Sequence, residues 1–183
     1  MSRDDNADNY ENLAECAMDP ELEQQLVNTQ RECVFMWTNK GGEAFGVVVA
    51  YLPKDGKIWM TAAEHRARIP AIRRFPRASV CINSVGTALG GGKTVTYKGS
   101  CVVHKDQAVK DWFYPEFSAY IHPTNVDTRA VFQAFLDSPT RVIIEFTPDY
   151  TLSFDNAKMM IRSPGAVGGA ASQLARPATP LES

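Results

Sequence analysis

The sequence predicts a mainly β protein whose antiparallel sheet closes toward a barrel, with helices at its flanks. Short segments rich in β-branched and aromatic residues follow one another along the chain. Two tight-turn sequences, Asn39–Gly42 and Pro53–Gly56, separate the first of them. Because a tight turn joins neighbouring strands of opposite direction, the sheet should be mostly antiparallel. Helical periodicity appears at Pro20–Thr29 and again after residue 105, so helices should flank the sheet.

Length and composition limit the class of protein. A chain of 183 residues fits one domain, and a net charge of −2 excludes a generally basic nucleic-acid-binding protein. No run approaches the ~20 apolar residues that a membrane-spanning helix needs. The four cysteines form no C-x-x-C pair and lie at no zinc-site spacing from a histidine. We therefore expect a soluble cytoplasmic protein without a metal site, a nucleic-acid partner or membrane contact.

The ends of the chain differ in composition from its centre. The acidic segment 1–18 and the Ser/Gly/Ala/Pro-rich segment 163–183 are expected to be disordered, which leaves residues 19–162 as the folded domain. Asp19 before Pro20 is typical of a helix start. The predicted strands and later helices are, in order, strands Glu32–Thr38, Ala44–Leu52, Lys57–Thr61, Ala78–Asn83 and Thr94–His104, helices Asp106–Ile121 and Thr124–Leu136, and strands Arg141–Phe146 and Tyr150–Phe154.

Glycine and proline positions refine this assignment. The glycine-rich segment Thr87–Lys93 lacks the spacing of a phosphate-binding P-loop and precedes a strand, so we interpret it as a hairpin connection. Gly99 within a strand predicts a bulge or a close backbone approach. Pro115 should kink or divide its helix, and Pro148 should mark a turn between two strands.

The segment Lys57–Asn83 carries the candidate chemistry. A strand ending in Thr61 leads into a basic helical segment, which then leads into a second strand. Arginine side chains and the start of a helix both suit a phosphate group. On spacing alone, an amphipathic helix with Ile69 and Ile72 inward and its arginines in water explains the pattern equally well. The basic residues of the segment are His65, Arg66, Arg68, Arg73, Arg74 and Arg77.

Reactive motifs are otherwise missing from the sequence. There is no G-x-S-x-G motif, no H-E-x-x-H motif and no facial-triad pattern. A cofactor would therefore have to carry any difficult chemistry, or the protein binds a ligand without converting it.

Three blocks together resemble the FMN-binding split β-barrel family, the relatives of pyridoxamine 5′-phosphate oxidase and of the deazaflavin (F420)-dependent reductases. The first is GVVVAYLPKDGKIWMT, a hairpin whose second strand ends in aromatic-x-Thr. The second runs from HRAR to FPRASV and is similar to the family's basic phosphate-binding segment. The third is TVTYKGSCVVH with the later RVIIEFTPDYTLSFDNAKM, and the resemblance covers about residues 20 to 160.

This resemblance implies a six-stranded antiparallel split barrel of the FMN-binding type that forms a homodimer with cofactor grooves at the subunit interface. Met60 and Thr61 would contact the ring or ribityl region, and the ring edge would lie along Val47, Val48 and Val49. Arg66 and Arg68 would hold the phosphate, with His65 beside them. Thr94 would reach the cofactor from the partner subunit.

The sequence also departs from the family pattern. The loop from Ala62 to Arg68 is one residue longer than in the oxidase, Arg68 stands where Lys is usual, and no R-x-H segment or C-terminal tryptophan follows Met160. The resemblance therefore implies not a true pyridoxamine-phosphate oxidase but an oxidoreductase that binds FMN or F420 and transfers a hydride to or from a small conjugated substrate. The alternatives are a non-catalytic flavin- or haem-binding protein, with His65 as an axial ligand, and a barrel that has lost its ligand and acts only by dimerising.

Overall fold

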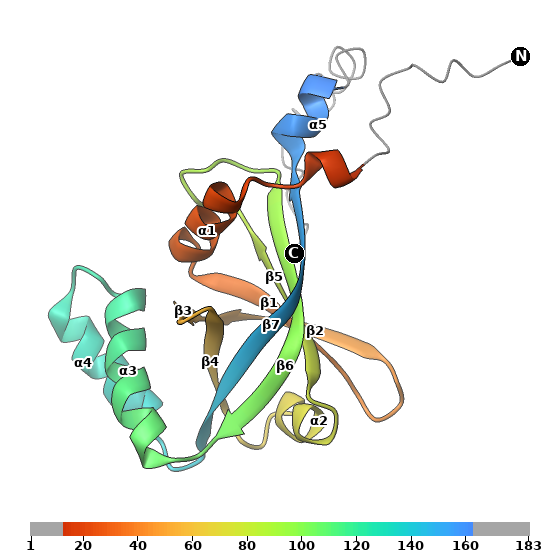
Figure 1. The fold of residues 1–183 in the computed structure, drawn as a ribbon. Coiled ribbons are helices and arrows are strands. Elements are labelled where there is room, and N and C mark those ends of the chain that lie inside the picture. The colour runs from red at the N-terminus through yellow and green to blue at the C-terminus, as the bar shows by residue number, and fades with distance from the viewer. Residues whose placement is uncertain (1–12, 163–183) are drawn as a thin grey trace, which may run out of the picture.

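A computed structural model describes residues 13–162 of the chain as one antiparallel sheet with flanking helices (Figure 1). The sheet has seven strands in the order β2-β1-β5-β6-β7-β4-β3, and every pair is antiparallel. The predicted mainly β architecture with flanking helices is therefore confirmed. The strands are β1 (Glu32–Thr38), β2 (Ala44–Ala50), β3 (Leu52–Lys54), β4 (Lys57–Ala63), β5 (Arg77–Asn83), β6 (Lys93–His104) and β7 (Arg141–Asp155).

The two edges of the sheet belong to one continuous stretch of chain, and this curls the sheet into a split barrel. β2 pairs with β1 at one edge, whereas β3 pairs with β4 at the other. Only Tyr51 separates them, so the single strand predicted over Ala44–Leu52 is divided in two. The six-strand count that the resemblance implied is not confirmed, since the sheet has seven strands. Tyr51 is fully buried, and its hydroxyl donates a 2.7 Å hydrogen bond to the Val27 carbonyl. That carbonyl belongs to the last turn of helix α1, where main-chain acceptors lack helical partners.

β7 runs without interruption through the segment where a turn was predicted. It pairs with β6 from Ile143 to Asp155, and the register shifts once, between Lys98 and Gly99. The prediction of two strands separated at Pro148 was therefore wrong: Gly99 pairs with Pro148 and Lys98 with Tyr150, so Asp149 is the extra residue of a bulge in β7 and the strand continues through the proline. The predicted bulge or close approach at Gly99 is confirmed.

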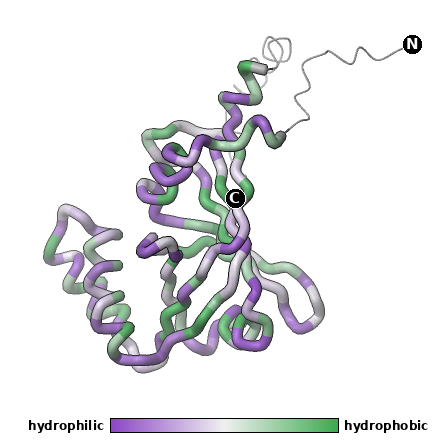
Figure 2. Tube along the Cα trace, in the orientation of Figure 1, coloured by the Kyte–Doolittle hydropathy of each residue, from purple (hydrophilic) through white to green (hydrophobic). Residues whose placement is uncertain are grey.

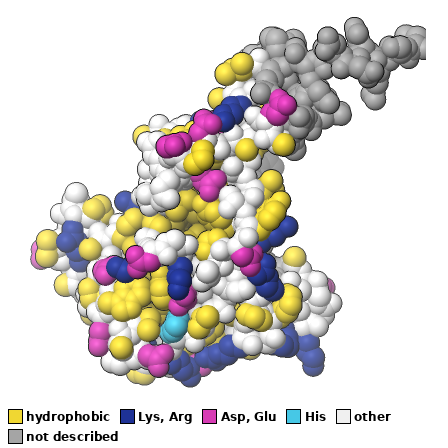
Figure 3. Space-filling view, viewed as in Figure 1, with side chains coloured by type: hydrophobic (Ala, Val, Ile, Leu, Met, Phe, Trp, Pro, Cys, Tyr) yellow, Lys and Arg dark blue, Asp and Glu magenta, His cyan; other side chains and the backbone are white. Residues whose placement is uncertain are grey.

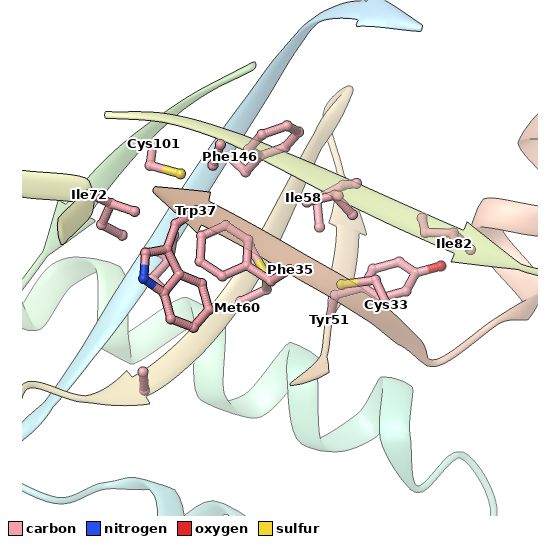
Figure 4. Packing of buried hydrophobic residues seen from close by; sticks show 14 of the residues in the cluster. Cys33, Phe35, Trp37, Tyr51, Ile58, Met60, Ile72, Ile82, Cys101 and Phe146 are labelled. Carbon is pink, nitrogen blue, oxygen red and sulfur yellow. The ribbon is translucent and has the colours of Figure 1, made fainter. Parts of the chain in front are cut away.

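Apolar side chains fill two regions. The first lies inside the barrel. Figure 4 shows Phe35 and Trp37 of β1 and Ile58 and Met60 of β4 pointing into it. The second, which we call the outer cluster, lies between the opposite face of the sheet and α3. It consists of Leu52, Trp59, Phe113, Tyr114, Phe117, Leu136 and Ile143. Figure 2 shows the hydrophobic residues concentrated along the central strands.

The helices surround the barrel. They are η1 (Leu13–Cys16), α1 (Pro20–Thr29), α2 (Arg68–Arg74), α3 (Gln107–Ile121), α4 (Val126–Leu136) and α5 (Asn156–Arg162). α3 and α4 lie side by side at one flank of the sheet, and α2 lies at the end of the barrel near the β1–β2 hairpin (Figure 1). α3 continues through Pro115 and is not divided there. Among residues 13–162, no helix is long and apolar enough to cross a membrane.

The described part of the chain begins at residue 13. Leu13–Cys16 form η1, and the side chains of Cys16 and Met18 are buried. The domain boundaries expected at residues 19 and 162 stay a prediction. The remaining parts of the two segments predicted to be disordered, 1–12 and 163–183, lie outside the described residues.

Candidate functional site

The split in the barrel leaves half of β4 without a strand on one side. β3 pairs with β4 only from Lys57 to Trp59, whereas β7 pairs with it from Ile58 to Ala63. Within the described residues, the edge from Met60 to Ala63 thus faces no strand. Unpaired main-chain groups at a sheet edge can bind a ligand. This is the segment whose main chain was predicted to contact a ring.

Met60 and Thr61 point to opposite sides of β4, as successive strand residues do. The Met60 side chain is 1% exposed and packs inside the barrel, so only its main chain can reach a ligand at the edge. Thr61 lies on the face covered by α3, and its hydroxyl donates to the Val142 carbonyl at 3.0 Å. The expected contact of the strand-end main chain and the Thr61 hydroxyl with a ring stays a prediction, and the Met60 side chain is not available for it.

The three valines of β2 also alternate. Val47 and Val49 pack against the interior of the barrel, whereas Val48 is 63% exposed on the other face. Their strand pairs with β1 on one side and, within the described residues, has no strand on the other. A ligand along this free edge would meet the N–H and C=O groups of alternate residues, and of the three side chains that of Val48 is the most exposed to it.

Beyond the end of β4, Arg68 lies within the electrostatic range of two other arginines, Arg66 and Arg141. Arg68 is half-buried, and its pKa is lowered first by burial and then by the positive charges of Arg66 and Arg141. Among the described residues, no carboxylate lies within 4.0 Å of any of these three guanidinium groups. Like charges held together without a counter-ion raise the energy of the ligand-free protein, and an anion between them would lower it. We call these three residues the arginine cluster.

Arg141 was not singled out by sequence reasoning. It comes 73 positions after Arg68 in the chain, and only the pairing of Ala63 with Arg141 brings it to the end of β4. No local motif marks Arg141 as a site residue, because the sequence around it is that of an ordinary buried strand, of which it is the first residue. Its guanidinium also lies over the Phe135 ring of α4, 5.3 Å from the centroid.

The other arginines of the basic segment have separate roles. Arg73 forms an ion pair with Glu64 at 2.8 Å, and Arg77 pairs with Asp149. Both are therefore unavailable as simple anion receptors. Arg74 has no carboxylate partner among the described residues and lines a cavity between the β1–β2 hairpin and α2. Figure 3 shows Lys and Arg side chains gathered along the edge of the molecule near α2.

The helix expected to contribute its N-terminus is short. α2 has 7 residues, and its N-cap residue, Ala67, offers no capping side chain. Any phosphate selectivity at this end of the barrel must therefore come from the guanidinium groups rather than from a long helix dipole.

His65 and Thr94 do not join the cluster within one chain. His65 is an exposed side chain in the loop between β4 and α2, with no polar partner among the described residues. Thr94 pairs with Phe154, whereas Thr61 pairs with Ile143, eleven residues earlier in β7. Since a strand rises ~3.3 Å per residue, Thr94 lies about 36 Å along the ladder from the Thr61 level. Its contact with a cofactor held by the partner subunit stays a prediction.

A group of buried polar atoms in the outer cluster lies beside Thr61. Tyr114 is 2% exposed, and burial raises the pKa of its hydroxyl, whereas the neighbouring Thr61 hydroxyl and Arg141 lower it. That hydroxyl, the Ser118 hydroxyl and the Trp59 indole N–H have no hydrogen-bond partner of good geometry in the described structure. Unpartnered buried polar atoms are unusual and mark places where a water or a ligand completes the bonding.

Three cavities of about 310–320 Å³ lie elsewhere on the chain. None of them is lined by Thr61, Arg66 or Arg68. Among residues 13–162, no group of three His, Cys, Asp or Glu side chains is assembled that could hold a metal ion.

Comparison with solved structures matches this architecture. Conserved hypothetical protein Rv2991 from Mycobacterium tuberculosis superposes with a TM-score of 0.67 at 16% identity, over 93% of this chain and 96% of the other. An F420 reductase superposes with a TM-score of 0.54 at 13% identity, over 70% and 94%. A Listeria innocua protein provisionally assigned as a pyridoxamine 5′-phosphate oxidase superposes with a TM-score of 0.55 at 14% identity, over 73% of this chain and 95% of the other.

The fold is that of the pyridoxamine 5′-phosphate oxidase-like split barrels. At the level of sequence, no family model matches the chain, and no curated protein does so either. Identities of 13–16% show the fold alone. The fold does not specify an activity, which depends on the residues that this split barrel places at its site.

Proposed function

We propose that this split barrel is an oxidoreductase that binds FMN or F420 and transfers a hydride to or from a small conjugated substrate. The observation that carries the proposal is the arginine cluster, Arg66, Arg68 and Arg141, which has no carboxylate partner among residues 13–162 and lies next to the free edge of β4. A phosphorylated ring compound fits both features: the phosphate on the cluster and the polar ring edge on main-chain groups. Both cofactors present a phosphate and a tricyclic ring, so this observation supports either.

The chain's own contribution would be binding and orientation. Arg66 and Arg68 would anchor the phosphate, with Arg141 as a third donor from β7. Main-chain groups of Met60 and Thr61 would align the ring, and Val48 would shield it from water. The bound ring supplies the hydride chemistry, because no described side chain forms a recognisable nucleophile or metal site.

The homodimer is part of this proposal. The free edges of β2 and β4 are exposed in one chain, and a second copy over them would turn an open surface into a groove. Thr94 would then contact the cofactor from the partner subunit, and His65 would contact it from the loop above the phosphate. A non-catalytic flavin-binding role would use the same groove. A haem-binding role rests on His65 alone, and no other feature of the structure favours it.

The deciding experiment starts with the absorbance spectrum of the freshly purified protein and mass spectrometry of any compound released on denaturation. FMN and F420 are then titrated separately by fluorescence. We expect the double variant Arg66→Ala/Arg68→Ala to weaken binding more than tenfold, because a hydrogen bond to a charged group contributes about 1.5–3 kcal/mol. Arg73→Ala is the matched control, since Arg73 lies on the same segment but is paired with Glu64. A protein that binds neither compound would rule out the proposal.

A further inference from the structure

A cavity of about 310 Å³ lies between the β1–β2 hairpin and α2. Trp37 and Phe45 come from the hairpin, and Ala67, Pro70 and Arg74 from the α2 side. The volume is that of a small-molecule site. It lies outside the arginine cluster, and nothing in the proposed hydride transfer uses it.

Stacked aromatic rings form one wall of the cavity. The rings of Trp37 and Phe45 lie 6.1 Å apart between centroids at an interplanar angle of 20°. Phe45 is 49% exposed, so its ring is accessible to a ligand in the cavity. Ala67 and Pro70 present small, flat apolar surfaces from the other side. This arrangement suits a planar ring.

Two cations stand at the same cavity. Lys40 and Arg74 both line it, and neither lies within 4.0 Å of a carboxylate among residues 13–162. Glu43, which is close to Lys40 in sequence, accepts a 2.7 Å hydrogen bond from the Asn39 amide instead. Arg73, by contrast, is paired with Glu64. The two free cations are therefore complementary to an anion.

We propose that this cavity binds a planar aromatic anion, with its ring against Trp37 and Phe45 and its acidic group between Lys40 and Arg74. The chemistry is shared by two sources: a free aromatic acid, which would be a substrate or effector, and the adenylate half of a flavin dinucleotide. The inference stands on the cavity, its aromatic wall and its unpaired charges, and it does not require flavin at Thr61.

The three tryptophans give a direct test. Each indole N–H produces its own signal in a ¹H–¹⁵N spectrum, and of the three, only Trp37 lines the cavity, whereas Trp59 and Trp112 pack together at the other flank. The signals are assigned with Trp37→Phe, and the full chain is titrated with 2-naphthoate and with its uncharged analogue 2-naphthamide. We expect 2-naphthoate to shift the Trp37 signal saturably and to leave the other two in place.

Charge variants separate this site from non-specific binding. Arg74→Gln should weaken the binding of 2-naphthoate by about three- to tenfold, because Arg74 is exposed and one solvent-screened ion pair is lost. The affinity for the uncharged 2-naphthamide should not change. Arg73→Gln, the same change one residue earlier, should leave the affinity within about twofold. Equal weakening by the two variants would overturn the proposal, as would a Trp37 signal that moves with neither 2-naphthoate nor AMP at millimolar concentrations.

The same spectra distinguish the sources. A Trp37 shift with FAD and none with FMN assigns the cavity to the adenylate of a dinucleotide. A 2-naphthoate shift that persists with saturating FAD assigns it to a free aromatic acid. If Phe45→Ala converts a dimer into a monomer in sedimentation velocity, a second copy of the chain covers the cavity and the proposal is wrong.

Discussion

Gly99 of β6 lies so close to Thr147 of β7 that a β-carbon at position 99 would sit 2.2 Å from the Thr147 carbonyl oxygen. The same atom would be 2.8 Å from the Phe146 ring, which is fully buried in the barrel. Neither main-chain oxygen nor core ring can move away cheaply. The long β6–β7 ribbon, the largest pairing in the sheet, thus depends on the absence of a side chain at its bulge.

Gly99→Ala should destabilise the protein by about 1–3 kcal/mol, as overpacking does in a well-packed core. Urea denaturation followed by circular dichroism measures the change in the free energy of unfolding. The matched control is Gly91→Ala, because a β-carbon at Gly91 would meet no atom within 4 Å. Equal stability of the two variants would show that the ribbon relaxes around position 99.

Arg141→Gln should weaken the binding of FMN or F420 by about tenfold, because it removes one charged donor from the arginine cluster. It should not lower the thermal stability of the ligand-free protein by more than about 1 kcal/mol, since it also relieves repulsion from Arg68. Fluorescence titration and a thermal melt measure the two effects separately. Arg77→Gln is the control for affinity, because Arg77 is occupied by Asp149. Unchanged affinity in Arg141→Gln would exclude this residue from the site.

Tyr51→Phe should cost about 1–2 kcal/mol of unfolding free energy. The substitution keeps the buried ring but leaves the Val27 carbonyl at the end of α1 without its 2.7 Å partner. Chemical denaturation measures the change in the free energy of unfolding. Tyr150→Phe is a suitable control because Tyr150 is exposed and donates no hydrogen bond within the described structure. A neutral result for Tyr51→Phe would mean that water replaces the lost donor.

Glu145 should make the stability dependent on pH in the acidic range. Burial raises the pKa of this carboxyl, but hydrogen bonds from Lys57 and His104 outweigh burial and hold the pKa below its usual value. A carboxyl whose pKa is lower in the folded state stabilises the protein above its unfolded pKa of ~4.3, and that contribution is lost as the pH falls through the folded pKa.

Glu145→Gln should therefore lower stability at pH 7 and make the loss between about pH 5 and pH 3 less steep than in the wild type. Denaturation midpoints across this range test both parts. Glu116→Gln changes a carboxylate in a more exposed ion pair with Lys54 and should leave the profile close to that of the wild type. Parallel profiles for the Glu145→Gln variant and the wild type would contradict the assigned role.

Local signals in the chain were sufficient for much of the fold. The hairpin turn at Asp55-Gly56 was predictable because both residues adopt positive φ, 53° and 71°, which Asp and Gly tolerate best. Helix α1 was predictable from Pro20 at its first position and its apolar spacing. The order strand–basic helix–strand over Lys57–Asn83 is confirmed for the same reason: each of these elements is specified by residues close together in the chain.

The composition of the site was decided by contacts between distant residues. Arg141 joins Arg66 and Arg68 only through the pairing of β4 with β7, while Arg73 and Arg77 leave the group because Glu64 and Asp149 fold beside them. The division of the strand at Tyr51 likewise accompanies a buried hydrogen bond to α1, and the passage of β7 through Pro148 accompanies a bulge at Asp149 that only the pairing with β6 reveals. Turn chemistry and periodicity act over a few residues and can be read along the chain. Which charges remain unpaired depends on the register between strands, and the register is fixed only when distant strands pair in the sheet.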